Sequence, residues 1–168
     1  FAKALQDLVV EAAYLFQPAL RNDWHDLHII TAKSKLANDR NYLYCRGNKM
    51  VLIMNVYKNS KSLGHQEIEV RPELVTLLKI WISLLKLLLD QAPQFPLYYA
   101  ITSKTIEFVN SDDALRRQIP RISERVFGIK LSVNDFRHLW EIDIQTNPNY
   151  ANMTMEQKKQ IHLQLLHG

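Results

Sequence analysis

The chain has 168 residues, of which 47% are hydrophobic and only 4 are Gly and 6 are Pro, so a disordered or low-complexity chain is excluded and one domain with its own core is predicted. Its 21 Lys and Arg exceed its 17 Asp and Glu, giving a net charge of +4. That charge permits a phosphate-bearing partner but does not by itself indicate nucleic-acid binding. The single cysteine, Cys45, cannot form an internal disulfide, so we interpret it as a buried structural thiol.

The first part of the chain changes from a helical to an extended pattern. Helical periodicity covers residues 1–16, and Pro18 ends it. Runs rich in β-branched and aromatic residues then predict short strands in "HIIT", "NYLYC", "MVLIMNVY" and "EIEV". "RGNK" has the Gly and Asn of a hairpin turn, and "KNSKSLGHQ" is predicted to be a hairpin tip.

The middle of the chain predicts one long core helix. Residues 74–90 are the most apolar segment, and Pro72 suits the first turn of a helix. A polar stripe along one face, formed by Lys79, Ser83, Lys86 and Asp90, argues against a membrane span. "PQFPLYYAIT" follows as an extended connection.

Three helices are predicted after that connection. The first is capped by Ser111 and closed by Gly128, and Pro120 inside it implies a kink or a division into two shorter helices. The second begins at Ser132, with Val133, Phe136 and Trp140 on one face, and ends at Asn147-Pro148. The last begins at Thr154, where Gln157 completes a capping box, and runs to Leu166. The predicted fold class is α+β, a mainly helical domain with a small three-stranded antiparallel sheet.

Four polar positions stand out, although each has an ordinary structural explanation. Arg21 follows a helix end, where a cation suits the helix dipole, and His167 could do the same at the end of the last helix. Lys58 and Lys61 could be solvated lysines in a hairpin tip, and Arg137 could pair with Glu141 one turn later.

Their order and setting give a resemblance that none of them gives alone. A helix leading into "LRNDW", a lysine in a β-hairpin, "FRH" on a helix and "LLHG" after a further helix together resemble the catalytic domain of the tyrosine recombinases, the phage-type and mobile-element integrases. The resemblance covers nearly the whole chain. It implies site-specific DNA strand cleavage and rejoining through a 3′-phosphotyrosyl intermediate, without metal or cofactor.

The resemblance also implies a role for each matching residue. Arg21 and Arg137 would hold the non-bridging oxygens of the scissile phosphate, because a guanidinium is a permanently charged bidentate donor. Lys58, or alternatively Lys61, would protonate the leaving 5′ oxygen, and His167 would donate to a non-bridging oxygen. Asp23, Asn134 and His138 would have supporting roles.

The chain departs from the family pattern at two places. Asn134 stands where the family has the histidine of its His-x-x-Arg box, and asparagine cannot shuttle a proton. No tyrosine follows His167, and Tyr150, in an Asn/Pro loop, is interpreted as structural. We therefore expect a single catalytic domain over residues 1–168, without the N-terminal DNA-clamping domain and the C-terminal tyrosine segment, and unable to cleave DNA as it stands.

The implied partner is double-stranded DNA, bound as a homotetramer by the full-length protein, with this fragment a monomer. Localisation is expected wherever the target DNA lies, in the host nucleus or at a viral replication site if the element is viral, and not outside the cell. Alternatives are a type IB topoisomerase, a non-catalytic DNA-binding relative and an α+β interaction domain with no DNA role. The candidate contacts to the DNA backbone are Lys33, Lys35, Arg40, Arg116, Arg117 and Arg121, which a solvated basic face explains equally well.

Overall fold

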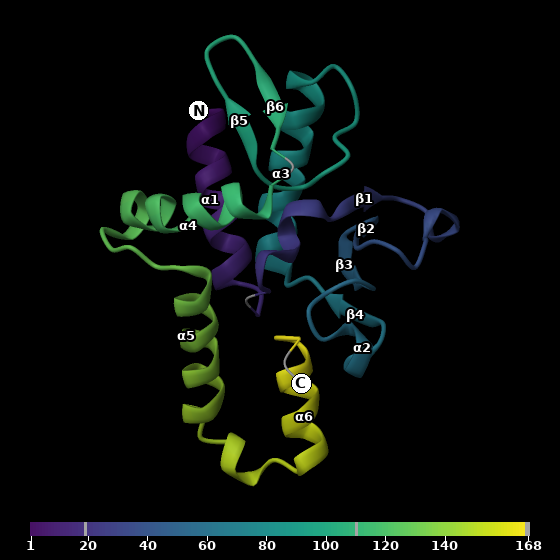
Figure 1. Ribbon diagram of the computed structural model, residues 1–168, viewed down its shortest axis with the longest axis vertical. Coiled ribbons are helices and arrows are strands. Elements are labelled where there is room, and N and C mark those ends of the chain that lie inside the picture. Colours follow the sequence, from purple (N-terminus) through teal and green to yellow (C-terminus); the bar gives the residue numbers. More distant parts are fainter. Residues whose placement is uncertain (19, 110, 167–168) are drawn as a thin grey trace.

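The computed structural model of the chain describes residues 1–18, 20–109 and 111–166, and of Asn22 only the backbone. It has the predicted α+β composition (Figure 1). In chain order its elements are α1 (Ala2–Leu15), η1 (Asn22–Asp26), β1 (His28–Ile30), η2 (Lys33–Lys35), β2 (Tyr42–Arg46), β3 (Lys49–Met54), α2 (Ser60–Leu63), β4 (Gln66–Glu69), α3 (Pro72–Leu88), β5 (Tyr99–Ile101), β6 (Ile106–Phe108), α4 (Asp112–Phe127), α5 (Val133–Thr146), η3 (Tyr150–Asn152) and α6 (Met155–Leu163).

The main sheet has four strands in the order β1-β2-β3-β4, so the predicted three-stranded antiparallel sheet is wrong. β1 pairs parallel with β2, with His28 opposite Tyr42, and the other pairs are antiparallel. The parallel pair arises because residues 31–41 carry the chain back before β2 begins, a connection that sequence periodicity does not reveal. The predicted turn between β2 and β3 is confirmed, with Gly47 at a φ of +57° that favours glycine.

Two further segments differ from the sequence prediction. The predicted extended connection contains β5, which pairs with β6 in a separate two-stranded sheet. The side chain of Gln6 on α1 holds this sheet, because it accepts from Tyr99 N at 2.7 Å and donates to Tyr99 O at 3.1 Å. The predicted hairpin tip contains the single-turn helix α2, which ends at Gly64 with a φ of +67°. Both differences depend on short segments whose pairing or docking partners lie elsewhere in the chain.

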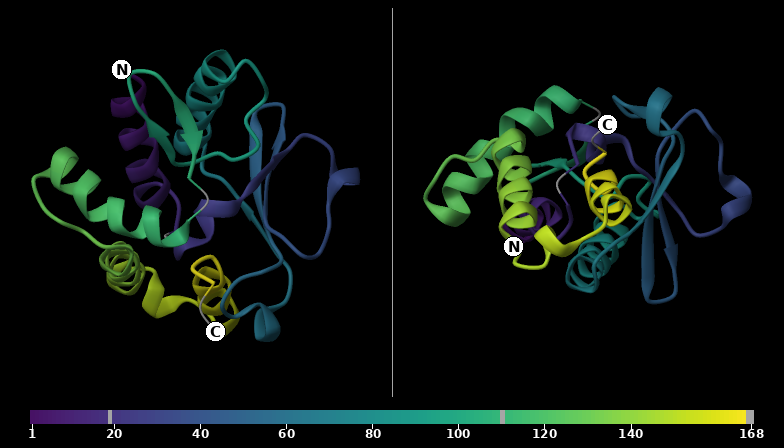
Figure 2. Two further views of the ribbon diagram at one scale, coloured as in Figure 1. Left: turned by 45° about the horizontal axis from the view of Figure 1, so that its top comes forward. Right: turned by 90° about the horizontal axis from the view of Figure 1, so that it is seen from below.

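The two faces of the main sheet are buried differently. One face contributes Leu43 and Leu52 to the large core, which α1, α3 and α4 complete (Figures 1 and 2). The opposite face carries a smaller cluster of Ile30, Tyr42 and Ile53, with Leu36 from the β1–β2 connection packed against it. In the described part of the chain, no helix is long and apolar enough to cross a membrane.

The helix ends follow the predicted signals with two exceptions. Ser111 caps α4 by accepting from Ala114 N, and Gly128 ends it in the left-handed conformation, as predicted. However, α4 continues through Pro120 as one helix, so the division into two helices is wrong. The last helix, α6, ends at Leu163 and not at Leu166. Leu166 has a φ of +52°, which cannot continue a right-handed helix.

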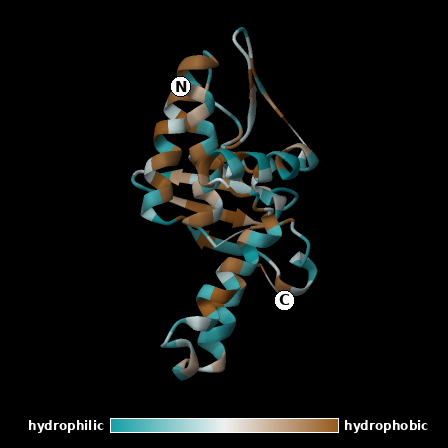
Figure 3. Cartoon of the chain, turned by 90° about the vertical axis from the view of Figure 1, so that its left-hand side faces the viewer, coloured by the Kyte–Doolittle hydropathy of each residue, from teal (hydrophilic) through white to brown (hydrophobic). Residues whose placement is uncertain are grey.

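Helices α5 and α6 project together from the body of the fold (Figures 1 and 2). Polar and apolar segments alternate along this projection (Figure 3), and Leu139 and Ile142 of α5 are 48% and 57% exposed. Val133 and Phe136 are buried and Trp140 is half-buried, so the predicted apolar face is confirmed. Helix α5 therefore contacts the core through its first two turns, and Arg137 lies in this part of the helix.

Replacing Ser132 with alanine is expected to lower the free energy of unfolding by about 1 kcal/mol. Ser132 Oγ accepts from Asp135 N, and Ser132 N donates to Asp135 Oδ2 at 2.7 Å, which forms the capping box of α5. Urea denaturation followed by circular dichroism measures the change. Ser103→Ala, in an exposed bend between β5 and β6, is the matched control and should leave the midpoint unchanged.

Candidate active site

Arg137 is buried where α5 meets the C-terminal end of the described chain. Its side chain lies on the second turn of α5, and the residue is 4% exposed. Its guanidinium donates to the carbonyl of Leu165 at 3.0 Å, and Leu165 is fully buried. Burying a guanidinium removes it from water and costs free energy, which its polar partners only partly offset. An apolar residue at this position of the helix would not carry that cost.

Tyr14, in the last turn of α1, and Arg21, just before η1, both lie on the α1 side of Arg137. The Tyr14 hydroxyl donates to the carbonyl of Arg21 at 3.1 Å, which ties the segment after α1 to the helix itself. Tyr14 also packs against Phe136 at 5.7 Å between ring centroids, and Trp140 Nε1 donates to Tyr14 O at 2.8 Å. These contacts hold the first turns of α5 against the end of α1 and bring the two arginines of the sequence pattern together.

The Arg21 cation is close enough to Arg137 to influence its pKa. Burial, and after it the Arg21 cation, lower the pKa of Arg137 from its ordinary value to about 10, although the carboxylates of Glu141 and Asp23 oppose the shift. Arg137 therefore stays charged at neutral pH. We call Tyr14, Arg21, Asp23 and Arg137 the arginine cluster.

Asp23 lies within the arginine cluster, on η1 just after Arg21. Burial raises the pKa of its carboxyl, with the Arg137 cation among the influences that oppose the rise. Its charge also raises the pKa values of Tyr14 and Tyr57, although burial is the larger cause in both cases. The Asp23 charge thus interacts electrostatically with groups of α1, of α5 and of the segment after β3.

The segment that carries Lys58 contacts the end of the described chain, next to the Leu165 partner of Arg137, through Asn59. Asn59 Nδ2 donates to the carbonyl of Leu166 at 3.1 Å, so residues 165–166 lie between α5 and the β3–β4 connection (Figure 1). Lys58 precedes Asn59 and is exposed, and Lys61, on α2, is also exposed. His167 follows this segment directly but lies outside the described residues.

The other two supporting candidates lie at the surface of α5. Asn134 is exposed, and His138 is exposed with Nδ1 3.5 Å from a carboxylate oxygen of Glu141. The structure therefore brings Arg21, Asp23 and Arg137 into one cluster, and Lys58 precedes Asn59, which contacts the residue after the Leu165 partner of Arg137. It does not bring His138 inward with Arg137, because adjacent helix residues point in different directions.

The basic residues predicted to contact DNA are spread over two distant surfaces, and four of the six have acidic partners. The residues of the β1–β2 connection and those of α4 lie on opposite sides of the molecule (Figures 1 and 2). The ion pairs join Lys33 to Glu67 at 3.1 Å, Arg40 to Asp39 at 3.1 Å, and both Arg116 and Arg117 to Asp113. Lys35 and Arg121 are exposed. These pairs fit a solvated basic surface at least as well as a DNA contact.

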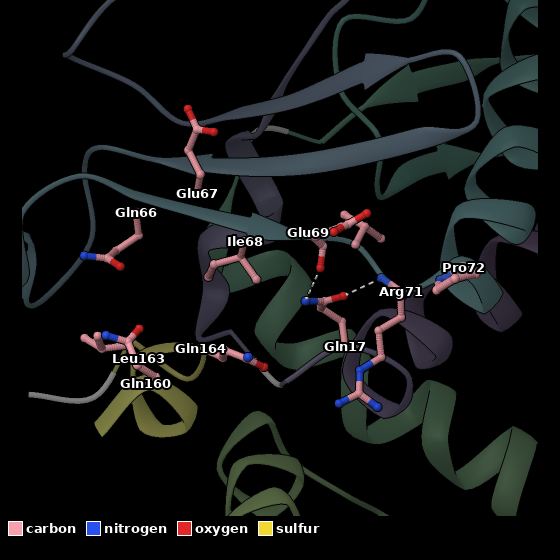
Figure 4. Close-up of a pocket in the computed structure, with 11 residues that line it drawn as sticks. Gln17, Gln66, Glu67, Ile68, Glu69, Arg71, Pro72, Gln160, Leu163 and Gln164 are labelled. Atoms are coloured by element: carbon pink, nitrogen blue, oxygen red, sulfur yellow. Dashed lines mark hydrogen bonds between the residues drawn. The ribbon is translucent and has the colours of Figure 1, made fainter. Parts of the chain in front are cut away.

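A polar cavity of about 460 Å³ opens between β4 and α6 (Figure 4). Gln17 forms one wall, with its side-chain amide donating to Glu69 O and accepting from Arg71 N. The guanidinium of Arg71 lies 4.9 Å from the centroid of the Trp140 ring. Trp140 is on α5, the helix that carries Arg137. Gln160 and Gln164 line the opposite wall. The cavity thus presents amide groups and Arg71, which contacts the cluster through Trp140, the donor to Tyr14 O.

Tyr14, Tyr57 and Tyr150 have hydroxyls that are already engaged. Tyr14 is fully buried and burial raises its pKa, while the Tyr57 hydroxyl donates to Gly64 O at 2.6 Å. Tyr150, on η3, has its hydroxyl 2.9 Å from His162 Nε2, and Lys158 lies 4.9 Å from its ring centroid. These contacts agree with the interpretation of Tyr150 as structural. Chemically, the cluster can hold an anion with two guanidinium groups, but a buried neutral phenol is a poor nucleophile.

Several residues of this site were not found from the sequence. Tyr14, Asn59 and Arg71 position the cluster through backbone carbonyls and ring stacking, and no local spacing signals such contacts. Tyr14 appears in the sequence only as one more aromatic residue of an apolar helix face.

No protein-family model and no curated protein sequence matches the chain. Among solved structures, the fold is similar to one described as the crystal structure of XerA recombinase, with a TM-score of 0.47 and 12% sequence identity. The likeness covers 97% of this chain, which spans 62% of that one.

Proposed function

We propose that this chain is the catalytic domain of a DNA-breaking and rejoining enzyme of the tyrosine recombinase type. The observation that carries the proposal is that Arg21 lies close enough to Arg137 to lower its pKa, although the two lie in separate parts of the sequence; Arg137 is buried and Arg21 is half-buried. Burial and, after it, the Arg21 cation lower the pKa of Arg137, and a bound phosphate would relieve the repulsion between the two cations.

In the proposed reaction the two guanidinium groups hold the non-bridging oxygens of a scissile phosphodiester. A tyrosine oxygen attacks the phosphorus while its phenolic proton passes to water or to a phosphate oxygen, the phosphorus–5′ oxygen bond breaks, and Lys58 or Lys61 protonates the departing 5′ oxygen. The Leu165 carbonyl now accepts from Arg137, so the phosphate must share that guanidinium with the carbonyl or displace it. His167 is proposed as a further donor, and Asp23 as the carboxylate that orients the arginines.

We further propose that the attacking tyrosine is supplied by a part of the protein beyond residue 168. The burial and hydrogen bonds of Tyr14 and Tyr57 support this, as does the contact of Tyr150 with His162. The proposed partner is double-stranded DNA, and the proposed active form is a homotetramer assembled on it. The proposed location is inside the cell, wherever the target DNA lies.

The test is to incubate a longer form of the protein, extended beyond residue 168, with a nicked suicide duplex in the absence of metal. Denaturing gels and mass spectrometry then report any covalent protein–DNA adduct and its site. We expect an adduct on a tyrosine beyond residue 168 that persists in Tyr150→Phe. An adduct on Tyr14 or Tyr150 would contradict the assignment of the nucleophile.

Two other outcomes would favour the alternative functions. DNA binding that is salt-sensitive, with no adduct on any duplex tested, would indicate a non-catalytic DNA-binding protein. An adduct accompanied by relaxation of supercoils, without exchange between two DNA partners, would indicate a type IB topoisomerase. A chain that binds no DNA even at low salt would leave only an interaction domain.

A further inference from the structure

A second cavity, of about 440 Å³, lies between the main sheet and α3 and shares no lining residue with the arginine cluster. Its walls are largely apolar and include Ile29, Met50, Ile82 and Pro93. Met50, Ile82 and Pro93 are buried and Ile29 is half-buried, so the cavity penetrates the surface of the core. A volume of this size is within the range of small-molecule sites, which runs from roughly 300 to 1,000 Å³.

Three lysines line this apolar cavity, and none of its lining residues is acidic. Lys79 and Lys86 are seven positions apart on α3 with Ser83 between them, and Lys35 comes from η2. They therefore approach from two elements. Lys79 Nζ donates to Asn48 Oδ1 at 2.8 Å, a neutral partner that leaves its charge uncompensated. The ion pairs among the described side chains engage other basic residues.

Cys45 on β2 shows that two of these cations converge on the cavity. Its thiol is half-buried in the cavity wall, and burial raises its pKa, while both Lys86 and Lys79 oppose the rise. Both ammonium groups are thus close enough to act on the same sulfur. Because the long lysine stems can lie along apolar walls with the charges at the rim, the cavity presents an apolar interior below a cationic opening.

This distribution matches a ligand with two chemically different ends. Apolar walls stabilise a hydrocarbon chain by removing it from water, and a cationic rim stabilises an anionic group that stays partly solvated. A small inorganic anion would leave the apolar interior unfilled, and a neutral hydrocarbon would leave the lysines uncompensated. A DNA backbone has the charge but no flexible apolar chain to enter the cavity.

We propose that this cavity binds a single-chain amphipathic anion, with its carboxylate or phosphate group between Lys79 and Lys86 and its hydrocarbon chain against Ile29, Met50 and Ile82. The site is independent of the proposed DNA chemistry. The bound ligand would contact both the sheet and α3. The ligand class is defined by an anionic end combined with a hydrocarbon chain short enough for the cavity.

The experiment is isothermal titration calorimetry of the 168-residue chain with decyl phosphate, decanoate, decanol and inorganic phosphate. The two ionic amphiphiles are kept below their micelle concentrations. We expect decyl phosphate or decanoate to bind, and inorganic phosphate and decanol to bind at least about tenfold more weakly. The double variant Lys79→Gln/Lys86→Gln should weaken binding of the anionic amphiphile by at least about tenfold. Lys104→Gln, an exposed lysine in the β5–β6 turn, is the matched control and should bind normally.

The single cysteine gives a second measurement that is specific for this cavity. Alkylation of Cys45 by a maleimide should slow when the amphiphile is bound, in the wild type and in Lys104→Gln alike. The carboxylate and phosphate arms distinguish the two possible head groups. Binding of inorganic phosphate as tight as that of decyl phosphate, equal binding of decanol, or lysine-independent binding would each overturn the proposal. So would protection of Cys45 by a DNA duplex alone, which would make this face a DNA contact.

Discussion

Replacing Arg137 with alanine is expected to slow covalent adduct formation on nicked DNA by at least about 10²-fold in the longer form of the protein. The reason is that Arg137 is one of the two guanidinium groups of the arginine cluster, and the negative charge on the phosphate oxygens grows as the tyrosine attacks. Single-turnover gels with a suicide duplex measure the rate. DNA affinity should fall much less, because most of it comes from phosphates outside the cluster.

The control variants separate this catalytic role from a structural one. Arg137→Ala also removes the hydrogen bond to Leu165 O, so its unfolding midpoint is measured alongside the rate. Arg137→Lys keeps the charge but loses the planar pair of donors, and we expect its rate to fall between those of the wild type and the alanine variant. Arg46→Ala, at the exposed end of β2, should react like the wild type. Equal rates for Arg137→Ala and Arg46→Ala would contradict the proposed role.

Replacing Glu11 with glutamine is expected to stabilise the fold at alkaline pH by up to about 3 kcal/mol. Glu11 lies on α1, is 1% exposed, and neither carboxylate oxygen has a hydrogen-bond partner among the described residues. Burial, assisted by the charge of Asp7, raises its pKa from the ordinary value of 4.5 to about 7, and the Arg125 cation only partly opposes this. Arg125 is itself held by Asp7 at 2.8 Å.

The sign of the pH dependence follows from this raised pKa. Between about pH 4.5 and 7 the folded chain keeps a proton on Glu11 that the unfolded chain has released. The stabilisation from the neutral carboxyl is therefore complete below pH 4.5 and is lost as the pH rises through 7. Glu11→Gln is neutral at every pH, so its advantage over the wild type should be absent at pH 4 and fully developed by pH 8.5.

Urea denaturation of both proteins at pH 4 and 8.5 measures the difference. Glu107→Gln, which removes an exposed carboxylate on β6, is the matched control and should track the wild type at both values. A pH-independent difference between Glu11→Gln and the wild type would show that Glu11 is not buried as a titrating carboxyl. Glu11 has a visible sequence signal, since it is flanked by Val10 and Ala12 on an apolar helix, but that pattern does not distinguish a buried face from an exposed one.

The parts of the fold that could be predicted are those whose causes are local. The caps at Ser111, Ser132 and Thr154 and the turn at Gly47 were all confirmed, because each depends on side chains or backbone conformations within a few residues. The parallel pairing of β1 with β2 and the sheet formed by β5 and β6 could not be predicted, because strand partners are chosen by long-range contacts.

The candidate site divides in the same way. The sequence supplied Arg21, Lys58 and Arg137 as residue types in a suggestive order, and each had an ordinary explanation by itself. Their relation depends on hydrogen bonds to the carbonyls of Arg21, Leu165 and Leu166, because those groups join α1, α5 and the β3–β4 connection around one position. A carbonyl belongs to every residue, so no sequence pattern can mark which ones will accept such a bond.

What the sequence determined alone was therefore the α+β class, the helix boundaries set by caps and glycine, and a set of cationic candidates. What only the tertiary structure decided was which of those cations are buried and which meet. Arg137 and its neighbour His138 illustrate the difference, since one is 4% exposed and the other has a largely exposed side chain. Local free-energy differences fix turns and caps, whereas the burial of a charge is set by the packing of elements distant in sequence, which decides how much water and how many other charges surround it.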